Sequence, residues 1–411
     1  MPLEISERGR RVPASPIRKL MPLADAAKRR GVKVYHLNIG QPDLETPPAM
    51  RAKLALAPKV FAYTPSAGTA ECVAALSEYY RRVGVTLSAD ELVVTTGGSE
   101  ALLFALLACA GEGDEALVVE PFYTNYMAFA TMAGVRLRPL RAHGEDGFHL
   151  PPLEEWTRAL TPRTRLVLLC NPGNPTGTVY RRDELEAVAG FCRDNGLFLV
   201  ADEVYREFVY DGRTATSILA LPGCDAIGVV VDSFSKRYSA CGIRLGSLAT
   251  RNREVHGAVL RMAQARLSPP GLAQLVALGT LELPPDYAQG IVREYQARRD
   301  VLFEGLKLLP GVLLRKPEGA FYFVARLPVE DADDFAAWLL SDFSHEGATV
   351  MVAPAQGFYA TPGLGRDEVR IAYVLCREDL EASVRILAHA LPQYQAARTA
   401  RLAGAQARAR A

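Results

Sequence analysis

The chain has 411 residues, and 47 Lys and Arg stand against 46 Asp and Glu, which gives a formal net charge of +1. Hydrophobic residues make up 49% and charged residues 23%, as in an ordinary globular protein, so disordered, collagen-like and coiled-coil classes are excluded. The near-neutral charge gives no reason to expect nucleic acid or an anionic membrane as the main partner.

The cysteines and the apolar runs indicate the cellular compartment of the protein. The 7 cysteines are scattered and form no C-x-x-C pair, which argues against a disulfide framework or a metal site and favours a reducing cytoplasm. The stretch from Met1 to Pro22 has no apolar segment of the kind found in signal peptides. The longest apolar run, Ala101 to Ala110, is shorter than the about 20 residues that a membrane helix needs. We therefore expect a cytoplasmic protein without a membrane anchor.

Short apolar runs alternate with helix-length segments through the middle of the chain. Each run is apolar on both faces, as in a buried parallel strand, and is followed by a turn rich in Gly, Pro, Asn or Asp. The alternation predicts an α/β domain, in which ligands bind at the carboxyl ends of the strands. The expected strands are 92–96, 116–120, 166–170, 197–201 and 228–231, with an amphipathic helix over 182–195.

The last part of the chain has a pattern typical of an α+β domain. We expect a large domain at 46–289, a small domain at 290–393, and residues 1–45 as an N-terminal arm that forms part of the small domain. The Ala- and Arg-rich tail at 394–411 is either a basic arm that touches phosphates or a frayed, solvated end, and we favour the second. The expected helices are 292–309 and 334–346, and the expected extended segments are 319–323, 349–353 and 369–374.

The first candidate for chemistry is the stretch from Ser233 to Lys236, which follows the apolar run that ends at Val231. At the end of a buried strand a lysine is held neutral more easily, and a neutral amine forms a Schiff base with an aldehyde. The hydroxyls of Ser233 and Ser235, together with Arg244, suit a phosphate group. Taken alone, a surface lysine beside a turn is the simpler interpretation.

The second candidate is Asp202, which follows the run 197–201. A buried carboxylate needs a cationic partner or several donors to stay ionised, and a protonated heteroaromatic nitrogen is one such partner. Tyr205, three residues later, is suited to donate its phenol to the same ligand. The simpler alternative is an Asp that caps the next helix.

Two further motifs also follow strand ends. The stretch from Gly97 to Glu100 opens a helix, and Gly98 and Ser99 expose backbone N–H groups there, which is a ready phosphate site. Asn174 lies in the stretch 171–177, where two prolines hold the backbone rigid and pre-position the amide side chain. Gly-Gly-Ser also forms plain turns, so the Asn-Pro stretch is the more specific of the two motifs.

A phosphate cradle, a reactive amine, a carboxylate for a ring nitrogen and donors for a ring oxygen together describe a site for pyridoxal 5′-phosphate. From Ser15 to Leu391 the order and spacing of these motifs resemble the class I/II (fold type I) aminotransferases of the aspartate aminotransferase family. The resemblance implies an α/β protein of fold type I, in which the large domain has a mainly parallel seven-stranded sheet and the smaller domain is α+β. It also implies a homodimer with shared active sites.

The resemblance further implies an aminotransferase with a ping-pong mechanism. The α-amino group of an L-amino acid, with an aspartate-like donor favoured, is expected to pass to a 2-oxo acid such as 2-oxoglutarate. A C–S β-lyase or a decarboxylase that acts on an amino acid is the alternative, since both use the same cofactor. A ligand-sensing transcriptional regulator is disfavoured, because few residues precede the family core and the net charge is near zero.

The resemblance assigns the cofactor contacts residue by residue. It implies that Lys236 binds the cofactor and transfers the proton of the reaction, and that Asp202 pairs with the pyridine nitrogen. Tyr205 and Asn174 would bond the ring hydroxyl, and Tyr123 would stack on the ring. The positions that match phosphate-binding residues, with the last reaching in from the neighbouring subunit, are Gly98, Ser99, Ser233, Ser235, Arg244 and Tyr63.

The resemblance also assigns substrate contacts. Arg370 matches the arginine that binds the substrate α-carboxylate in a bidentate contact, and Gly40 would add a backbone donor. Asn174 would contact the substrate too, and the bond between Asn174 and Pro175 is expected to be cis. Arg266 lies near the position of an arginine that reads a distal carboxylate from the other subunit, and a structural salt bridge is the alternative.

Two positions depart from the family pattern. The stretch 239–244 reads Ser-Ala-Cys-Gly-Ile-Arg, where relatives often have Met-Thr-Gly-Trp-Arg, so Arg244 is kept within a changed packing environment. Ser99 stands where some aspartate-specific relatives carry a lysine. Specificity for a dicarboxylate therefore stays open at the level of the sequence.

Overall fold

The computed structural model describes residues 3–410 and the side chains of residues 3–399, and the chain divides into two compact units. The first unit contains residues 3–13, Gln41–Arg293 and Glu318–Ala320, and the remainder forms the second unit. The sequence groups residues 1–45 with the small domain, whereas this division assigns 3–13 to the first unit. The change of unit after Arg293 falls inside a helix, α12 (Tyr287–Leu306). The predicted domain boundaries remain predictions.

The core of the first unit is a seven-stranded sheet in the order β2-β8-β7-β6-β5-β3-β4. Neighbouring strands run parallel except at β8, which is antiparallel to both β2 and β7. This mainly parallel seven-stranded sheet confirms the expected fold class. The strands are β2 (Leu92–Thr95), β3 (Glu115–Glu120), β4 (Arg136–Arg141), β5 (Thr164–Cys170), β6 (Phe198–Asp202), β7 (Gly228–Ser233) and β8 (Gly246–Ala249).

Two strands of this sheet are absent from the sequence prediction. The strand β4 lies at an edge of the sheet and alternates arginine with leucine and proline, so it lacks the continuous apolar run of a central strand. The strand β8 is a short Gly-Ser-Leu-Ala segment with no β-branched residue. Both strands form because neighbouring strands supply their hydrogen-bond partners, which the local sequence does not reveal.

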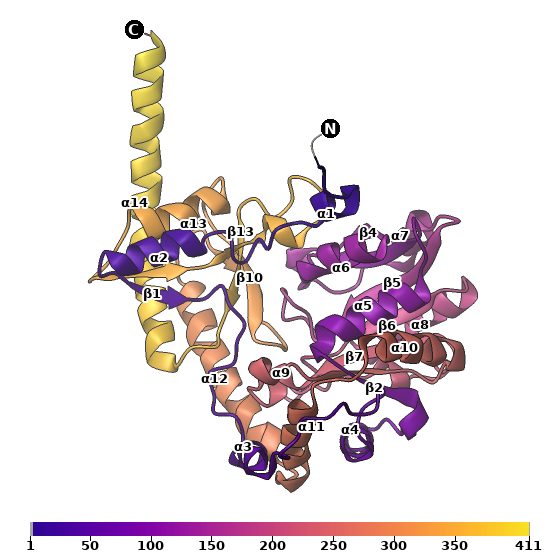
Figure 1. The fold of residues 1–411 in the computed structure, drawn as a ribbon. Coiled ribbons are helices and arrows are strands. Elements are labelled where there is room, and N and C mark those ends of the chain that lie inside the picture. The colour runs from indigo at the N-terminus through magenta and orange to yellow at the C-terminus, as the bar shows by residue number, and fades with distance from the viewer. Residues whose placement is uncertain (1–2, 411) are drawn as a thin grey trace. The chain divides into compact units, whose positions relative to one another are not determined.

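Helices pack against the sheet, and one of them is the largely buried α5 (Gly97–Cys109). It contacts β6, β7 and β8 (Figure 1). Its residues Ala101, Leu102 and Phe104 are among those buried. An α-helix that is apolar on all sides is typical of such a position. The other helices that contain residues of this unit, besides α12, are α1 (Glu7–Arg11), α3 (Pro48–Ala52), α4 (Ala70–Arg82), α6 (Asn125–Ala133), α7 (Leu153–Ala159), α8 (Arg182–Asp194), α9 (Phe234–Arg237), α10 (Arg253–Arg266) and α11 (Gly271–Ala277).

The second unit contains two sheets. The strand β1 (Lys33–His36) pairs in parallel with β11 (Ala348–Met351). An antiparallel four-stranded sheet has the order β12-β13-β10-β9, in which β13 (Glu368–Ala372) lies between β12 (Ala353–Pro354) and β10 (Tyr322–Arg326). The short strand β9 (Leu313–Leu314) forms one edge. The predicted α+β character of this part of the chain agrees with these sheets.

Three helices complete the second unit together with α12. The helix α2 (Met21–Arg29) packs on α13 (Ala332–Ser341), as Figure 1 shows, and α14 (Arg377–Arg410) is the longest. The helix α13 starts at the Asp331 cap, which accepts hydrogen bonds from the N–H groups of Asp333 and Asp334, so it begins and ends earlier than predicted. The backbone of the tail continues α14, and the side chains of Arg401, Arg408 and Arg410 lie outside the described residues.

The predicted strand at 319–323 is displaced. The strand β10 begins only at Tyr322, whereas Gly319 forms a β-bridge with Val209 in the first unit. A Cβ at Gly319 would lie 2.6 Å from the carbonyl oxygen of Phe208, so glycine is needed for this close approach. The segment Glu318–Ala320 therefore belongs to the first unit rather than to the strand.

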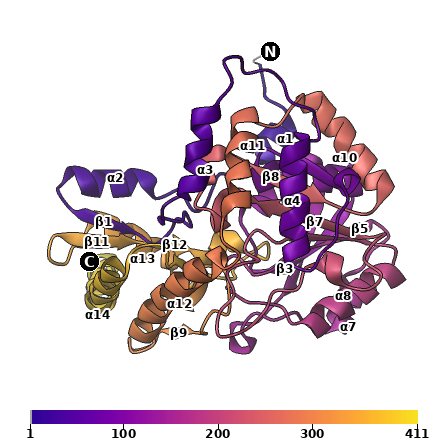
Figure 2. The ribbon, with the colours of Figure 1, turned by 90° about the horizontal axis from the view of Figure 1, so that it is seen from below.

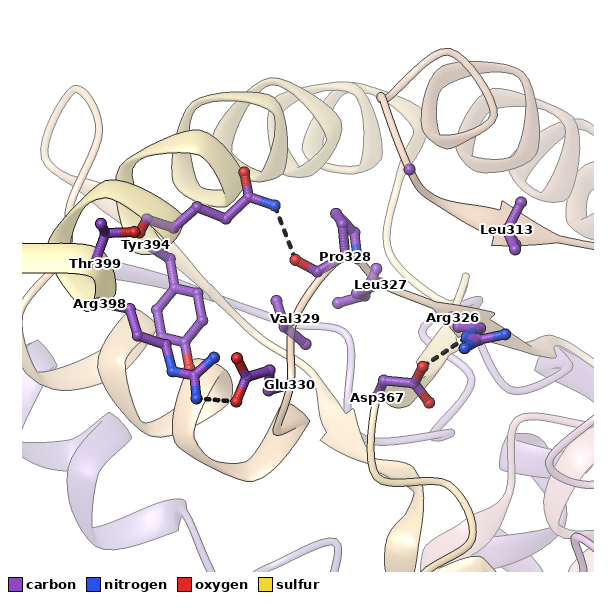
Figure 3. Close-up of a pocket in the computed structure, with 12 residues that line it drawn as sticks. Leu313, Arg326, Leu327, Pro328, Val329, Glu330, Asp367, Tyr394, Arg398 and Thr399 are labelled. Carbon is purple, nitrogen blue, oxygen red and sulfur yellow. Dashed lines mark hydrogen bonds and ion pairs between the residues drawn. The ribbon is translucent and has the colours of Figure 1, made fainter. Parts of the chain in front are cut away.

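A pocket of about 640 Å³ lies on the second unit, between α14 and the turn at 326–330 (Figure 3). Its charged side chains pair with each other: Arg398 with Glu330, and Arg326 with Asp367 at 2.5 Å. Among the residues that the structure describes, no helix is long and apolar enough to cross a membrane.

Candidate active site

The strand order brings three candidate segments to one edge of the sheet. Within the sheet Cys170 at the end of β5 pairs with Asp202 at the end of β6, and Asp202 in turn pairs with Val231 of β7. The stretch 171–177, Asp202 and the stretch 233–236 therefore follow the ends of neighbouring parallel strands. This is the edge at which α/β sheets bind their ligands.

The start of α5 lies against Arg244. A Cβ at Gly97 would lie 2.5 Å from Nη2 of Arg244, and Gly97 has a positive φ of +74°. A Cβ at Gly246, at the start of β8, would lie 2.5 Å from the carbonyl carbon of Gly97. Only glycines permit this approach of a guanidinium and a strand to the helix N-terminus. Both the positive end of the helix and the arginine favour an anion at this place.

Two serines line the same region. Ser233 caps α9, since its Oγ accepts a hydrogen bond from the N–H of Ser235 at 3.1 Å. The Oγ of Ser235 lies 2.9 Å from that of Ser233 and accepts a hydrogen bond from Arg244 at 3.5 Å. A Cβ at Gly98 would lie 3.6 Å from the Cβ of Ser233, in ordinary contact. The structure thus brings Gly98, Ser233, Ser235 and Arg244 together at the start of α5, where Ser99 also lies, and their binding of a phosphate remains a prediction.

Lys236 lies in α9 and is half-buried. The next residue, Arg237, belongs to a cluster of buried ion pairs. Arg237 forms an ion pair with Asp232 and another with Glu207 at 3.3 Å, and its guanidinium lies 4.0 Å from the ring centroid of Tyr79. Asp232 also pairs with a second arginine, Arg206, at 3.3 Å. No motif in the sequence indicates this ion cluster, which fixes the segment that carries Lys236.

Asp202 is 8% exposed, and burial raises the pKa of its carboxyl group to about 6. Its Oδ2 accepts a hydrogen bond of 2.8 Å from the phenol of Tyr126, and its Oδ1 accepts one of 3.3 Å from the N–H of Val204. The charges of Asp232 and Glu203 raise the pKa further. A carboxyl group in such surroundings is ionised most easily beside a cation, and the protonated nitrogen of a pyridine ring supplies one.

The other predicted ring contacts are buried or half-buried. Asn174 is 4% exposed, and its peptide bond to Pro175 is cis, which confirms that prediction. Tyr205 is 5% exposed, and the hydroxyl of Tyr123 accepts a hydrogen bond of 2.8 Å from Asn125. Together with Asp202 and the cradle, these residues fit pyridoxal 5′-phosphate.

Two predicted residues of the first unit have different surroundings. The side chain of Tyr63 is 80% exposed in this single chain. Arg266 donates a hydrogen bond of 3.0 Å to the carbonyl of Ser66 and pairs with Glu100 at 3.5 Å, and burial lowers the pKa of its guanidinium. The salt bridge that was the alternative for Arg266 is therefore present, and its role toward a substrate stays a prediction.

The predicted carboxylate-binding residues belong to the second unit. Arg370 in β13 is 2% exposed and donates a hydrogen bond to the carbonyl of Asn38. Its guanidinium lies 4.5 Å from the ring centroid of Tyr322 and 5.0 Å from that of Phe358. A Cβ at Gly40 would lie 1.6 Å from the hydroxyl of Tyr322, so only glycine fits there. Tyr322 thus contacts both predicted residues, although the sequence analysis assigned it only to a strand.

Fold and site together define a class of protein. A lysine, a buried carboxylate and a phosphate cradle at one edge of a mainly parallel seven-stranded sheet define a pyridoxal-phosphate enzyme of fold type I. Residues 32–387 match the family model described as aminotransferase class I and II, so the chain belongs to this family. It is a pyridoxal-phosphate-dependent aminotransferase, as the sequence predicted.

Relatives and solved structures agree with this assignment. The chain is 31% identical to the aspartate/prephenate aminotransferase of Thermus thermophilus, over 89% of this chain and 92% of that protein. It is 30% identical to aromatic-amino-acid aminotransferase 2 of Thermococcus litoralis, over 93% and 97% respectively. A structure of a single mutant of Thermus thermophilus aspartate aminotransferase superposes with a TM-score of 0.86 at 30% identity, covering 95% of this chain and 100% of that chain.

Proposed function

We propose that this aminotransferase moves the α-amino group of an aspartate-like L-amino acid to a 2-oxo acid such as 2-oxoglutarate. The observation that carries the proposal is the meeting of Asp202, Lys236 and the Arg244 cradle at the ends of neighbouring strands. When bound there, pyridoxal 5′-phosphate supplies an electron sink for the α-carbon of the amino acid. The names of relatives that act on aspartate and prephenate support the choice of donor.

Different residues of the first unit would bind the phosphate and the ring of the cofactor. The N–H groups at the start of α5, the two serines and Arg244 bind the phosphate. Asp202 holds the pyridine nitrogen protonated, and Asn174 and Tyr205 bond the ring hydroxyl, while Tyr123 stacks on the ring. These contacts would hold the cofactor ring in one position relative to Lys236, which transfers the proton.

Lys236 acts as the base and then the acid. Its amine would take the proton from the α-carbon of the amino acid and would hold it for return in the later part of the transfer. Arg370, supported on Tyr322 and Phe358, binds the α-carboxylate with two parallel hydrogen bonds, and the backbone at Gly40 adds a further donor. A single bound orientation of the substrate follows from these contacts.

The proposed active form is a homodimer. Exposed apolar side chains gather on the segment 54–63 and near α11, where α3, α4 and α11 lie side by side (Figure 2). Single exposed apolar residues are ordinary, but such a group on one region indicates a protein partner. The exposed side chains are Leu54, Leu56, Val60, Phe61, Tyr63, Leu267, Leu272 and Leu281. In the dimer Tyr63 would reach the phosphate of the neighbouring subunit.

We also propose a cytoplasmic location. All cysteines of the chain are free thiols, and five of them are buried. Free buried thiols are typical of proteins that remain in a reducing compartment.

The visible absorption of the purified holoenzyme tests the donor. Single amino acids are added without any 2-oxo acid, and aspartate is expected to convert the aldehyde form of the cofactor to its amine form faster than alanine, phenylalanine or tyrosine does. A faster reaction with the aromatic amino acids would replace aspartate in the proposal. Release of ammonia and pyruvate without an acceptor would instead indicate the β-lyase.

A further inference from the structure

Tyr126 makes a buried contact to the carboxylate that the mechanism assigns to the ring nitrogen. It lies in the first turn of α6 and is 1% exposed, and its phenol donates a hydrogen bond of 2.8 Å to Oδ2 of Asp202. The other carboxylate oxygen accepts the N–H of Val204 at 3.3 Å. Tyr126 and Asp202 are 76 positions apart in the chain, so no local motif contains both residues.

The position of this phenol is fixed by its neighbours. The ring of Tyr126 stacks on that of Phe122, with centroids 6.2 Å apart, and meets the ring of Tyr123 edge-on at 5.6 Å. Its backbone N–H donates to the carbonyl of Tyr123 at 2.9 Å. The same turn therefore carries both the residue proposed to stack on the cofactor and the donor to Asp202.

The charges around Asp202 make the donor important. Asp232 on β7 and Glu203 after β6 are anions that oppose ionisation of Asp202, and the thiol of Cys170 on β5 is protonated, because burial raises its pKa. Arg206 is close to these anions and pairs with both Asp232 and Glu203. Among the side chains that surround Asp202, Tyr126 is the hydrogen-bond donor that lowers the pKa of its carboxyl group.

We propose that Tyr126 is a positioning residue whose phenol holds Asp202 ionised and in one orientation for the pyridine nitrogen of the cofactor. The inference rests on the proposed role of Asp202. A phenol that acts through Asp202 affects the binding of ligands with a ring nitrogen and has no effect once the carboxylate is removed. A phenol that only packs α6 against the sheet affects all ligands alike.

The test compares two ligands on apoenzymes. Pyridoxal 5′-phosphate and its analogue with carbon in place of the ring nitrogen are titrated into wild type, Tyr126→Phe, Asp202→Asn and the double variant. Loss of one hydrogen bond to a charged group weakens binding of pyridoxal 5′-phosphate roughly ten- to a hundredfold in Tyr126→Phe. Affinity for the analogue is expected to stay within about twofold of wild type, because no ring nitrogen is present. Tyr80→Phe, which removes an equally buried phenol oxygen from the same unit, is expected to change neither affinity.

The outcomes separate the inference from the proposal beneath it. In the Asp202→Asn background Tyr126→Phe is expected to have no further effect, since the two changes act through one contact. Equal weakening for both ligands, or additive effects of the two substitutions, would overturn the positioning role of Tyr126 and leave that of Asp202 intact. Unchanged affinity of Asp202→Asn for pyridoxal 5′-phosphate would instead overturn the assignment of Asp202, and with it the inference.

Discussion

The surroundings of Asp202 determine which chemistry its carboxyl group can perform. In the sequence it is an acidic residue after a strand, for which, taken alone, a helix cap is the simpler interpretation. In the structure, burial and the charges of Asp232 and Glu203 raise the pKa of its carboxyl group to about 6, although the hydrogen bond from Tyr126 lowers it. Without a cation this ionised carboxylate lowers the stability of the folded protein, and the proposed pairing with the cofactor nitrogen would offset that loss.

The stability of the apoenzyme is therefore expected to depend on pH through Asp202. The folded-state pKa is raised, so the folded protein binds the proton more tightly, and stability falls as pH rises from about 4 to 6. The difference in unfolding free energy between wild type and Asp202→Asn is expected to change by about 3 kcal/mol across this range. Urea unfolding of both apoenzymes at several pH values measures it. A difference that does not vary with pH would contradict the raised pKa.

Replacement of Lys236 is expected to separate binding from catalysis. Lys236→Ala removes the amine that moves the proton, so turnover is expected to fall below detection, whereas the phosphate cradle and Asp202 are unchanged. Circular dichroism and retention of noncovalently bound pyridoxal 5′-phosphate measure the fold and the cradle. Lys307→Ala, in the turn that follows α12 in the second unit, serves as the control and is expected to retain full activity. Wild-type turnover in Lys236→Ala would exclude its catalytic role.

The helix α9 shows how a short element is held by its neighbours. Its 4 residues are too few for a helix that is stable alone, and its first turn depends on the Ser233 cap. The side chain of Arg237 then fixes it, through buried pairs to Asp232 and Glu207 and a hydrogen bond of 3.2 Å to the carbonyl of Ser233. The position of Lys236 therefore depends on contacts that the residue itself does not make.

Breaking this cluster is expected to destabilise the apoenzyme strongly. Arg237→Met leaves Asp232 buried without one of its two guanidinium partners, which lowers the unfolding free energy by about 3–5 kcal/mol. Arg253→Met removes an ion pair with Asp90 in which the two side chains are 71% and 55% exposed, and it is expected to change the stability very little. Urea unfolding compares the two variants. Similar losses in both would mean that the cluster adds nothing beyond an ordinary surface pair.

At the scale of the whole molecule, the proposed dimer makes each site depend on two chains. The side chain of Tyr63 is exposed here, in a segment that also exposes Val60 and Phe61. A tyrosine that reaches the phosphate of a partner would contribute to a site whose Lys236 belongs to the other chain. Two inactive variants could therefore complement each other in a mixed dimer.

Mixed dimers are expected to recover activity. When Lys236→Ala and Tyr63→Ala subunits are dissociated, mixed equally and reassembled, half of the dimers contain one complete site. Roughly a quarter of wild-type activity is expected at limiting cofactor, well above either variant alone. If Tyr63 serves its own chain, no dimer contains a complete site and the mixture is no more active than its components. Size-exclusion chromatography verifies that both variants remain dimeric.

The sequence by itself determined the fold class and the cofactor, and it identified Lys236, Asp202 and Asn174 as candidate site residues, whose roles remain predictions. It did so because central strands are continuous apolar runs, and the polar residues that follow each run reach the same edge of the sheet. The edge strand β4 escaped prediction because its pattern is mixed and its partner lies on another segment.

Only the tertiary structure decided which side chains support the motif residues. Tyr126 donates a hydrogen bond to Asp202, which is 76 positions away in the sequence, and Arg206 donates one to Asp232, which is 26 positions away. No local sequence pattern predicts either contact. Tyr322 likewise contacts Gly40 from 282 residues away. The reason is physical: hydrogen bonds and ion pairs depend on distance in space, and strand order and helix packing set those distances after the chain has folded.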